Sequence, residues 1–155
     1  TIGGYDRVVR IHCINDNSVP VESVEAHLTD LFKLDDEGRY SSVGFSTTVR
    51  LSWTRQWILP WHRRKEEVEE RVFSRTIPAH GKAPFYVLKQ FGSRSVYLMG
   101  EEELFEYRHL FDRMGTFRAV IQVSAKDMAP AVATVEFSFD EAGRIMAAHA
   151  GEGVT

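Results

Sequence analysis

The residues best suited to chemistry or binding lie in one segment near the middle of the chain, Arg55–Lys65. Two tryptophans in this Trp-rich basic segment are separated by three residues, and a histidine and three cations directly follow the second tryptophan. Tryptophan and arginine are enriched among the residues that dominate binding between proteins. The predicted binding residues are Trp57, Trp61, His62, Arg63, Arg64 and Lys65.

Other interpretations of this segment stay open. Tryptophans beside cations also suit the headgroup region of an anionic membrane, or bases stacked on the rings with phosphates on the cations. The simplest interpretation involves no ligand. In it, Trp57 and Trp61 cover one end of the core, and the cations pair with glutamates between positions 66 and 70, because opposite charges three or four positions apart attract on a helix. Among the interpretations that involve a ligand, we favour a protein partner.

Catalytic and metal-binding patterns are missing from the sequence. The six histidines form no HxH or HExxH arrangement, so we expect no metal site. There is no GxSxG elbow, P-loop or GxGxxG, so neither nucleophilic catalysis nor a bound nucleotide is indicated. His12 and His27 fall on polar faces of neighbouring candidate strands, where we expect a solvated pair. The chain is therefore predicted to be non-enzymatic and to need no cofactor.

Composition bounds the class of protein. The 155 residues are enough for one domain, which we place at 1–155. Because residue 1 is threonine, two explanations stay open: an initiating methionine was removed, or the domain is a piece of a longer protein. A net charge of −3 argues against a nucleic-acid binder. No apolar run reaches the length of a membrane helix, so we expect a cytoplasmic protein whose membrane association would come through upstream segments. The single cysteine, Cys13, excludes an intrachain disulfide and is read as a buried strand residue.

Alternation of apolar and polar residues predicts most of the elements that position these groups. In the second candidate strand, Val24, Ala26, Leu28 and Asp30 share one face. Two acidic segments, 35–38 and 140–143, each end in glycine and predict turns. The candidate strands cover residues 7–14, 21–33, 43–53, 71–77, 85–88, 95–98, 117–123, 131–139 and a short piece at 144–146.

One segment breaks the β pattern. Leu104, Tyr107, Phe111 and Met114 are three or four positions apart, which predicts an amphipathic helix over residues 101–114. The prediction is a mainly all-β protein, an antiparallel β-sandwich of seven or eight strands with this one short helix.

The order of features resembles the immunoglobulin-like accessory domains of bacterial proteins. Three pieces carry the resemblance: the strand Arg7–Ile14 with its turn and the residues 21–26 that follow, the strand Val49–Trp53, and the late strand Gly115–Ala125. The chain has no cysteine pair, and Phe117 stands where such domains often have a tyrosine. The resemblance implies an interaction or sensory module of a larger bacterial protein or assembly.

A second resemblance supplies the alternative function. The ending Phe137–Ile145 is similar to the last hairpin of NTF2-like domains, which are α+β proteins that bind or convert small ligands. Such domains usually begin with long helices, whereas this chain opens with strands. High helix content would therefore favour the alternative.

Overall fold

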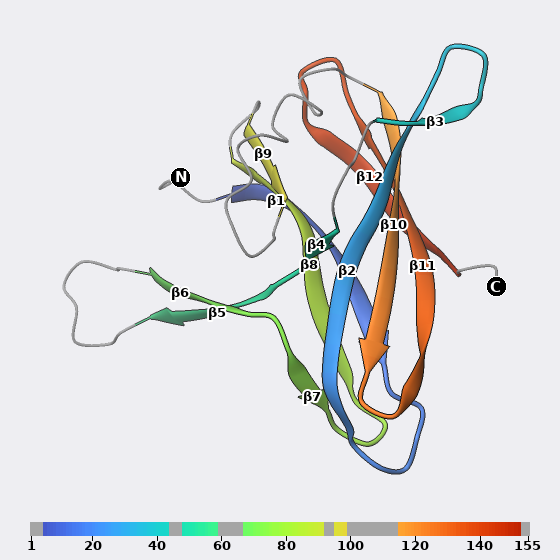
Figure 1. Cartoon of the computed structure of the whole chain (residues 1–155). Helices are drawn as coiled ribbons and strands as arrows, with labels where there is room; N and C mark the ends of the chain where they lie inside the picture. The colour runs from blue at the N-terminus through green and yellow to red at the C-terminus, as the bar shows by residue number, and fades with distance from the viewer. Residues whose placement is uncertain (1–4, 44–47, 59–66, 92–94, 99–114, 153–155) are drawn as a thin grey trace.

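The structure is a computed structural model and describes residues 5–43, 48–58, 67–91, 95–98 and 115–152. These residues form twelve β-strands and contain no helix (Figure 1). The strands are β1 Tyr5–Ile14, β2 Val21–Leu34, β3 Tyr40–Ser42, β4 Val49–Arg50, β5 Trp53–Ile58, β6 Glu67–Val72, β7 Arg75–Ile77, β8 Lys82–Phe91, β9 Ser95–Leu98, β10 Thr116–Ala125, β11 Met128–Phe139 and β12 Ile145–Glu152.

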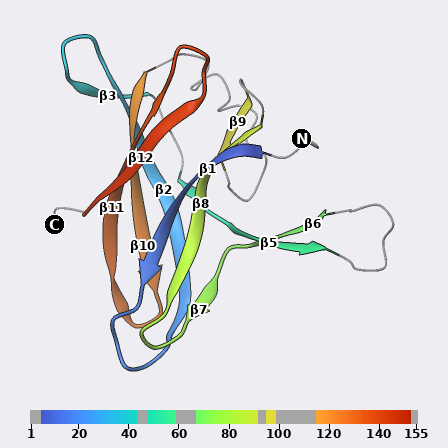
Figure 2. The same cartoon turned by 180° about the vertical axis from the view of Figure 1, so that it is seen from behind.

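Every strand pair is antiparallel, which confirms the mainly-β, antiparallel prediction. The largest sheet has the order β12-β11-β10-β2-β3, and β4 and β7 also pair with β2. A second sheet has the order β1-β8-β9, and β5 pairs with β6 in a two-stranded ribbon. Figure 2, seen from behind, shows β1 and β8 lying across one face of the larger sheet.

The long strand β2 organises the larger sheet. One of its edges pairs with β10 along most of its length. The other edge is covered by three short strands in succession, with β7 beside its start, β4 beside its middle and β3 beside its end. The candidate strand 43–53 is therefore wrong as a single element. Its described part contains β4 and the first residue of β5, separated by Leu51 and Ser52.

A β-bulge in β2 changes which residues face the core. Asp30 pairs with Val120 but Leu28 pairs with Ile121, so Thr29 is the extra residue. Its hydroxyl donates a hydrogen bond of 3.2 Å to the carbonyl of Val120. Simple alternation placed Asp30 on the same face as Leu28. Because of the bulge, the next buried residue is Leu31 instead, and Asp30 is only half-buried. The buried residues of β2 are Val24, Ala26, Leu28 and Leu31.

A second bulge has the same effect in β8. Val9 of β1 pairs with Leu88, and the next residue of β1 pairs with Tyr86, so Val87 is extra. Val87 and Leu88 are consequently both buried, and the inward row continues at Gln90. The Gln90 amide is satisfied there: it donates to the carbonyl of Gly143 at 2.6 Å and accepts from the backbone N–H of Ile145 at 2.9 Å.

Both sheets contribute to one hydrophobic core. Within it, the rings of Phe117 and Phe137 are stacked with centroids 5.5 Å apart, and Phe139 meets both edge-on. Aromatic pairs in these arrangements add about 0.5–1.5 kcal/mol beyond the burial of their area. The buried apolar residues include Val9 and Ile11 of β1, Ala83, Phe85 and Val87 of β8, and Ala119 and Ile121 of β10.

Both acidic turns predicted from the sequence are confirmed, and they have the same hydrogen-bond pattern. The carboxylate of Asp35 accepts from the N–H groups of Glu37 and Arg39, at 2.9 and 2.8 Å. Asp140 repeats both bonds to the residues two and four positions ahead, each at 2.9 Å. A glycine with φ near +80° precedes the arginine in each turn. The motif Asp-x-x-Gly-Arg thus reverses the chain after β2 and again after β11.

Most other element predictions hold, with different lengths. The strands at 7–14, 21–33, 95–98, 117–123 and 131–139 are present within β1, β2, β9, β10 and β11. The piece at 144–146 is wrong in length, because β12 continues to Glu152. The predicted strand 71–77 is interrupted between β6 and β7. The predicted number of strands, seven or eight, is lower than the twelve that the described residues form. The helix predicted over residues 101–114 lies outside the described residues.

Candidate functional site

The predicted binding residues fall on or beyond the two-stranded ribbon. Trp57 belongs to β5, where its backbone pairs with Val68 of β6. Trp61, His62, Arg63, Arg64 and Lys65 lie outside the described residues, so they remain predicted binding residues.

The ribbon extends away from the two larger sheets in both views (Figure 1, Figure 2). Its strands pair with one another over six residues each, which is about 20 Å of chain. At its base, Ser52 forms an isolated bridge to Tyr86 of β8, and the N–H of Tyr86 donates to the Ser52 carbonyl at 2.8 Å. The base of the ribbon is thus tied to the smaller sheet.

Register gives the ribbon two unlike faces. Trp53 and Trp57 occupy alternate positions of β5 and therefore share a face. The residues paired with them in β6 are Val72 and Val68. One face thus combines tryptophan and valine positions around a central Arg55–Glu70 pair. The other face has the pairs Thr54–Arg71, Gln56–Glu69 and Ile58–Glu67.

A cavity of about 340 Å³ opens where three turns meet. These turns join β1 to β2, β7 to β8, and β10 to β11, and we call this region the turn end. The volume falls at the lower end of the range of small-ligand sites. The residues lining this turn-end cavity are Cys13, Ile14, Asn15, Asp16, Asn17, Val21, Val24, Ile77, Val123, Ser124, Ala125, Met128, Ala129 and Ala131.

Apolar side chains continue from the cavity onto the surface. Ile14 is 67% exposed and Met128 is 48% exposed, although both line the cavity. Val19, at 62% exposed, lines a neighbouring hollow that shares Val21 and Met128 with the cavity. Large apolar side chains kept in water around an apolar hollow indicate a binding surface rather than a closed core.

The buried side-chain amide of Asn15 cross-links the turns at the turn end. The Asn15 side chain, in a residue only 4% exposed, donates to the carbonyls of Val19, Ile77 and Pro78 at 2.9, 3.2 and 3.0 Å. Its oxygen accepts from the N–H of Asn17 at 2.9 Å. These bonds join the β1–β2 turn to residues more than sixty positions later, so the cavity has a preformed polar frame.

Cys13 lines the cavity, and the pKa of its thiol is shifted. Burial raises the pKa of its thiol from 9.0 to about 11, and the positive charge of Arg75 opposes part of that rise. The thiol therefore stays protonated at neutral pH and behaves as a small apolar group. Cys13 lies in β1, as predicted, but it is half-buried rather than buried and packs against the core.

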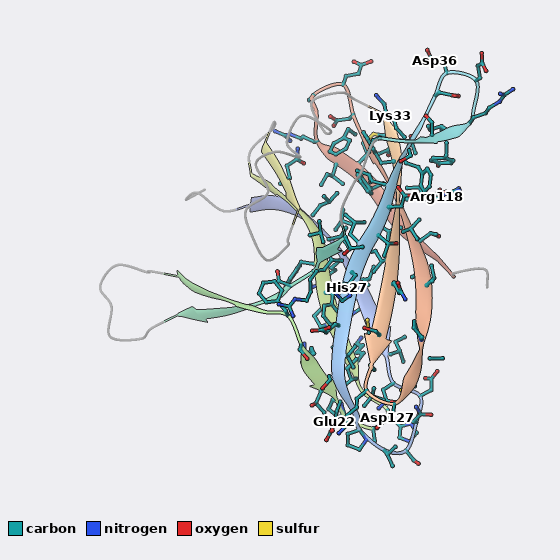
Figure 3. The ribbon with its side chains drawn as sticks, viewed as in Figure 1. Glu22, His27, Lys33, Asp36, Arg118 and Asp127 are labelled. Carbon is teal, nitrogen blue, oxygen red and sulfur yellow. The ribbon has the colours of Figure 1, made fainter. Side chains whose placement is uncertain are left out.

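Three carboxylates lie at the turn end. Asp16 lines it, and Glu22 and Asp127 line the neighbouring hollow. Figure 3 shows Glu22 and Asp127 together at the turn end. Lys126 lies 3.8 Å from Glu22 and partly offsets that charge. Ser23, His80 and Asp127, the non-glycine residues with positive φ in the described part of the chain, also lie in or beside these turns.

The expected pair of histidines is wrong. His12 lies opposite Pro84 in the smaller sheet, whereas His27 lies opposite Gln122 in the larger one. Partial burial, together with the charges of Arg10 and Lys82, lowers the pKa of His12. Among the described residues, no group of three or more histidine, cysteine, aspartate or glutamate side chains is arranged to hold a metal ion. The same part of the chain has no helix long and apolar enough to cross a membrane.

Sequence reasoning missed the turn-end cavity. Its lining residues are ordinary strand and turn residues, drawn from five separate parts of the chain. The available signal was the apolar run Met128–Val132, which is exposed throughout. No family model, curated protein or solved structure matches this chain, so the candidate site stands on the geometry given above.

Proposed function

We propose that the chain is a non-enzymatic binding module with an immunoglobulin-like β-sandwich fold, and that it holds an apolar group of a protein partner in the turn-end cavity. The observation that carries the proposal is the cavity itself, which is mostly apolar, preformed and surrounded by exposed Ile14, Val19 and Met128. Burying such side chains against a partner removes apolar surface from water and favours binding.

Two antiparallel sheets with a common core support the sandwich part of the proposal. By analogy with the accessory domains that the sequence resembles, the module would serve a larger bacterial protein or assembly. An interaction role also fits the Trp-rich basic segment, whose residue types favour a protein partner.

An environment-sensitive dye tests the cavity. We expect anilinonaphthalene sulfonate to bind the native protein with a blue-shifted emission, and we expect Ala131→Trp to abolish this signal by filling the mouth. Met146→Trp is the matched control, because Met146 is 58% exposed and does not line the cavity. Equal dye binding by both variants would overturn the proposed site.

A further inference from the structure

We propose that the partner docks as an extended peptide segment, which adds a strand to the larger sheet beside Met128–Val132 of β11 and directs an apolar side chain into the turn-end cavity. The inference rests on the proposed function, because it needs the cavity to be a binding site. It adds the conformation of the partner, an extended backbone, and the position of the apolar residue that the cavity holds.

β11 is longer than the strand that covers its outer edge. β12 pairs with β11 from Phe139 as far as Ala133, where it ends at Glu152. β11 continues for five more residues, Met128–Val132, whose other edge lies beside β10. Among the described residues, no strand pairs with the outer edge of this segment. Figure 1 shows β11 continuing to the turn end after β12 has diverged from it. The segment Met128–Val132 is thus a free edge of the sheet.

The hydrogen bonds of β11 show which backbone groups face the free edge. The N–H of Phe139 donates to the carbonyl of Gly115 at 3.0 Å, so Phe139 directs its backbone groups toward the side of β10. Successive residues of a strand direct these groups to opposite edges. The register with β10 is regular from Phe139 to Val132, and Val132 lies an odd number of positions away. Val132 therefore directs an N–H donor and a C=O acceptor outward, which an extended peptide backbone can pair with.

The free edge leads directly into the cavity. Ala131 and its pairing partner Val123 both line the cavity. Paired residues of neighbouring strands lie on the same face of a sheet. A residue placed opposite Ala131 on an added strand would therefore be directed toward the cavity as well. Ala129 and Ala131 are small and leave space beside them, so this residue can be larger, and the valines of the cavity wall favour an apolar one.

The composition of the free edge favours strand addition. All five residues of Met128–Val132 are exposed and none is charged. Met128 and Val132 keep 48% and 44% of their surface in water. Proteins commonly protect a free edge from other strands with charged side chains, lysine in particular. An exposed apolar edge without such charges is suited to pairing with another chain.

Pro130 argues against a second copy of this chain as the partner. A symmetric antiparallel pair of copies that used the whole free edge would be centred on Pro130. Two prolines would then lie opposite one another, and neither has an N–H to donate. A different chain is not restricted in this way, since its own N–H groups can donate to the carbonyl of Val132. We therefore assign the free edge to an extended segment of another protein.

Titration with a defined peptide tests strand addition. The probe is the capped peptide KTVTLTVTK, which alternates apolar residues with threonine between two lysines. We expect the native chain to bind it with a dissociation constant below about 1 mM. The peptide KTSTSTSTK, with serine in place of each apolar residue, is the control and should not bind, because it has no side chain for the cavity.

Two variants separate the free edge from the cavity. Val132→Pro removes the outward N–H and should weaken binding of the probe peptide about tenfold or more. Val132→Thr keeps the N–H and a β-branched side chain, so it should bind the peptide as the native chain does. Dye binding should be unchanged in both variants, because Val132 does not line the cavity.

Hydrogen exchange of the native chain keeps the test independent of whether a variant folds. The amide of Val132 should exchange rapidly in the free chain, whereas that of Thr134, which pairs with Gly151 of β12, should be protected. Saturation with the probe peptide should slow exchange at Val132. Exchange at Val132 that the bound peptide leaves unchanged would overturn the proposed strand pairing.

The outcomes distinguish this inference from the proposed function. Peptide binding that is lost in Ala131→Trp but unchanged in Val132→Pro overturns strand addition and leaves the cavity as the site. Absence of peptide binding up to about 1 mM, with dye binding that still depends on Ala131, has the same meaning. A native dimer that the peptide dissociates would assign the free edge to a second copy and overturn the choice of partner. If dye and peptide both bind without regard to Ala131, the proposed function fails together with this inference.

Discussion

The thiol of Cys13 makes the stability of the fold depend on pH. Its raised pKa means that the folded protein holds the thiol neutral where an unfolded chain would begin to ionise it. The residue therefore adds stability that is fully present below pH 9.0 and is lost as the pH rises through about 11.

This behaviour gives the pH prediction. We expect the free energy of unfolding of the native chain to fall more steeply between pH 9.0 and about 11 than that of Cys13→Ser, whose hydroxyl does not titrate there. Urea unfolding of both proteins at several pH values measures the difference, because all other titrating groups are shared. Parallel curves would contradict the buried position of the thiol.

Asn15 holds the turn end together through its single amide. We expect Asn15→Ala to lower the free energy of unfolding by about 2–3 kcal/mol, since the buried amide is lost and three buried or part-buried carbonyls lose a donor. Asn17→Ala is the matched control in the same turn, where the residue is exposed and a change within about 0.5 kcal/mol is expected. Equal losses in the two variants would exclude a special role for the Asn15 amide.

At the scale of single residues, the sequence located Asn15 within a turn but could not reveal its partners. Those partners, Ile77 and Pro78, are brought near by the pairing of β2 with β7 and of β1 with β8. The same limit applies to the cavity, whose wall residues are adjacent only in the folded chain. The predicted binding residues came from local composition, which requires no knowledge of the fold.

At the scale of elements, local alternation predicted the long strands because each has one buried face. It failed at Thr29 and Val87, where a bulge shifts the inward row by one residue. It also failed at 43–53, since the break between β4 and β5 arises from pairing with two different sheets. Bulges and changes of partner depend on neighbouring strands, which are distant in the sequence.

The turn after β2 offers the clearest test of a local element. Gly38 has φ of +80°, and a Cβ added there would meet nothing within 4 Å. Gly38→Ala should therefore lower the free energy of unfolding by about 1–2 kcal/mol, entirely through backbone strain. Glu37→Ala in the same turn should change it by less than about 0.5 kcal/mol. Chemical denaturation compares the two, and similar values would mean that the turn does not hold Gly38 in the left-handed region.

At the scale of the whole molecule, circular dichroism separates the two fold classes that the sequence allowed. A β-sandwich with a helix limited to residues 101–114 predicts about one tenth helix, whereas an NTF2-like cone predicts about one third. We expect a strand-dominated spectrum with helix content near the lower value. A helix content near one third would favour the NTF2-like alternative.

The whole molecule also separates its two candidate binding surfaces. The ribbon carries the residue types that composition singled out, while the cavity at the turn end is visible only in the fold. The lining of the cavity comes from separate parts of the chain, so no single stretch of sequence reveals it.

The most direct test of the central claim is methyl NMR of the native chain during titration with anilinonaphthalene sulfonate. If the turn-end cavity is the binding site, the largest shifts should be those of Val21, Val24, Ile77 and Val123, which line it. The methyl groups of Leu31 and Ile145, which are buried and do not line the cavity, should stay in place. Shifts centred on Leu31 and Ile145, or spread evenly over the core, would contradict the account.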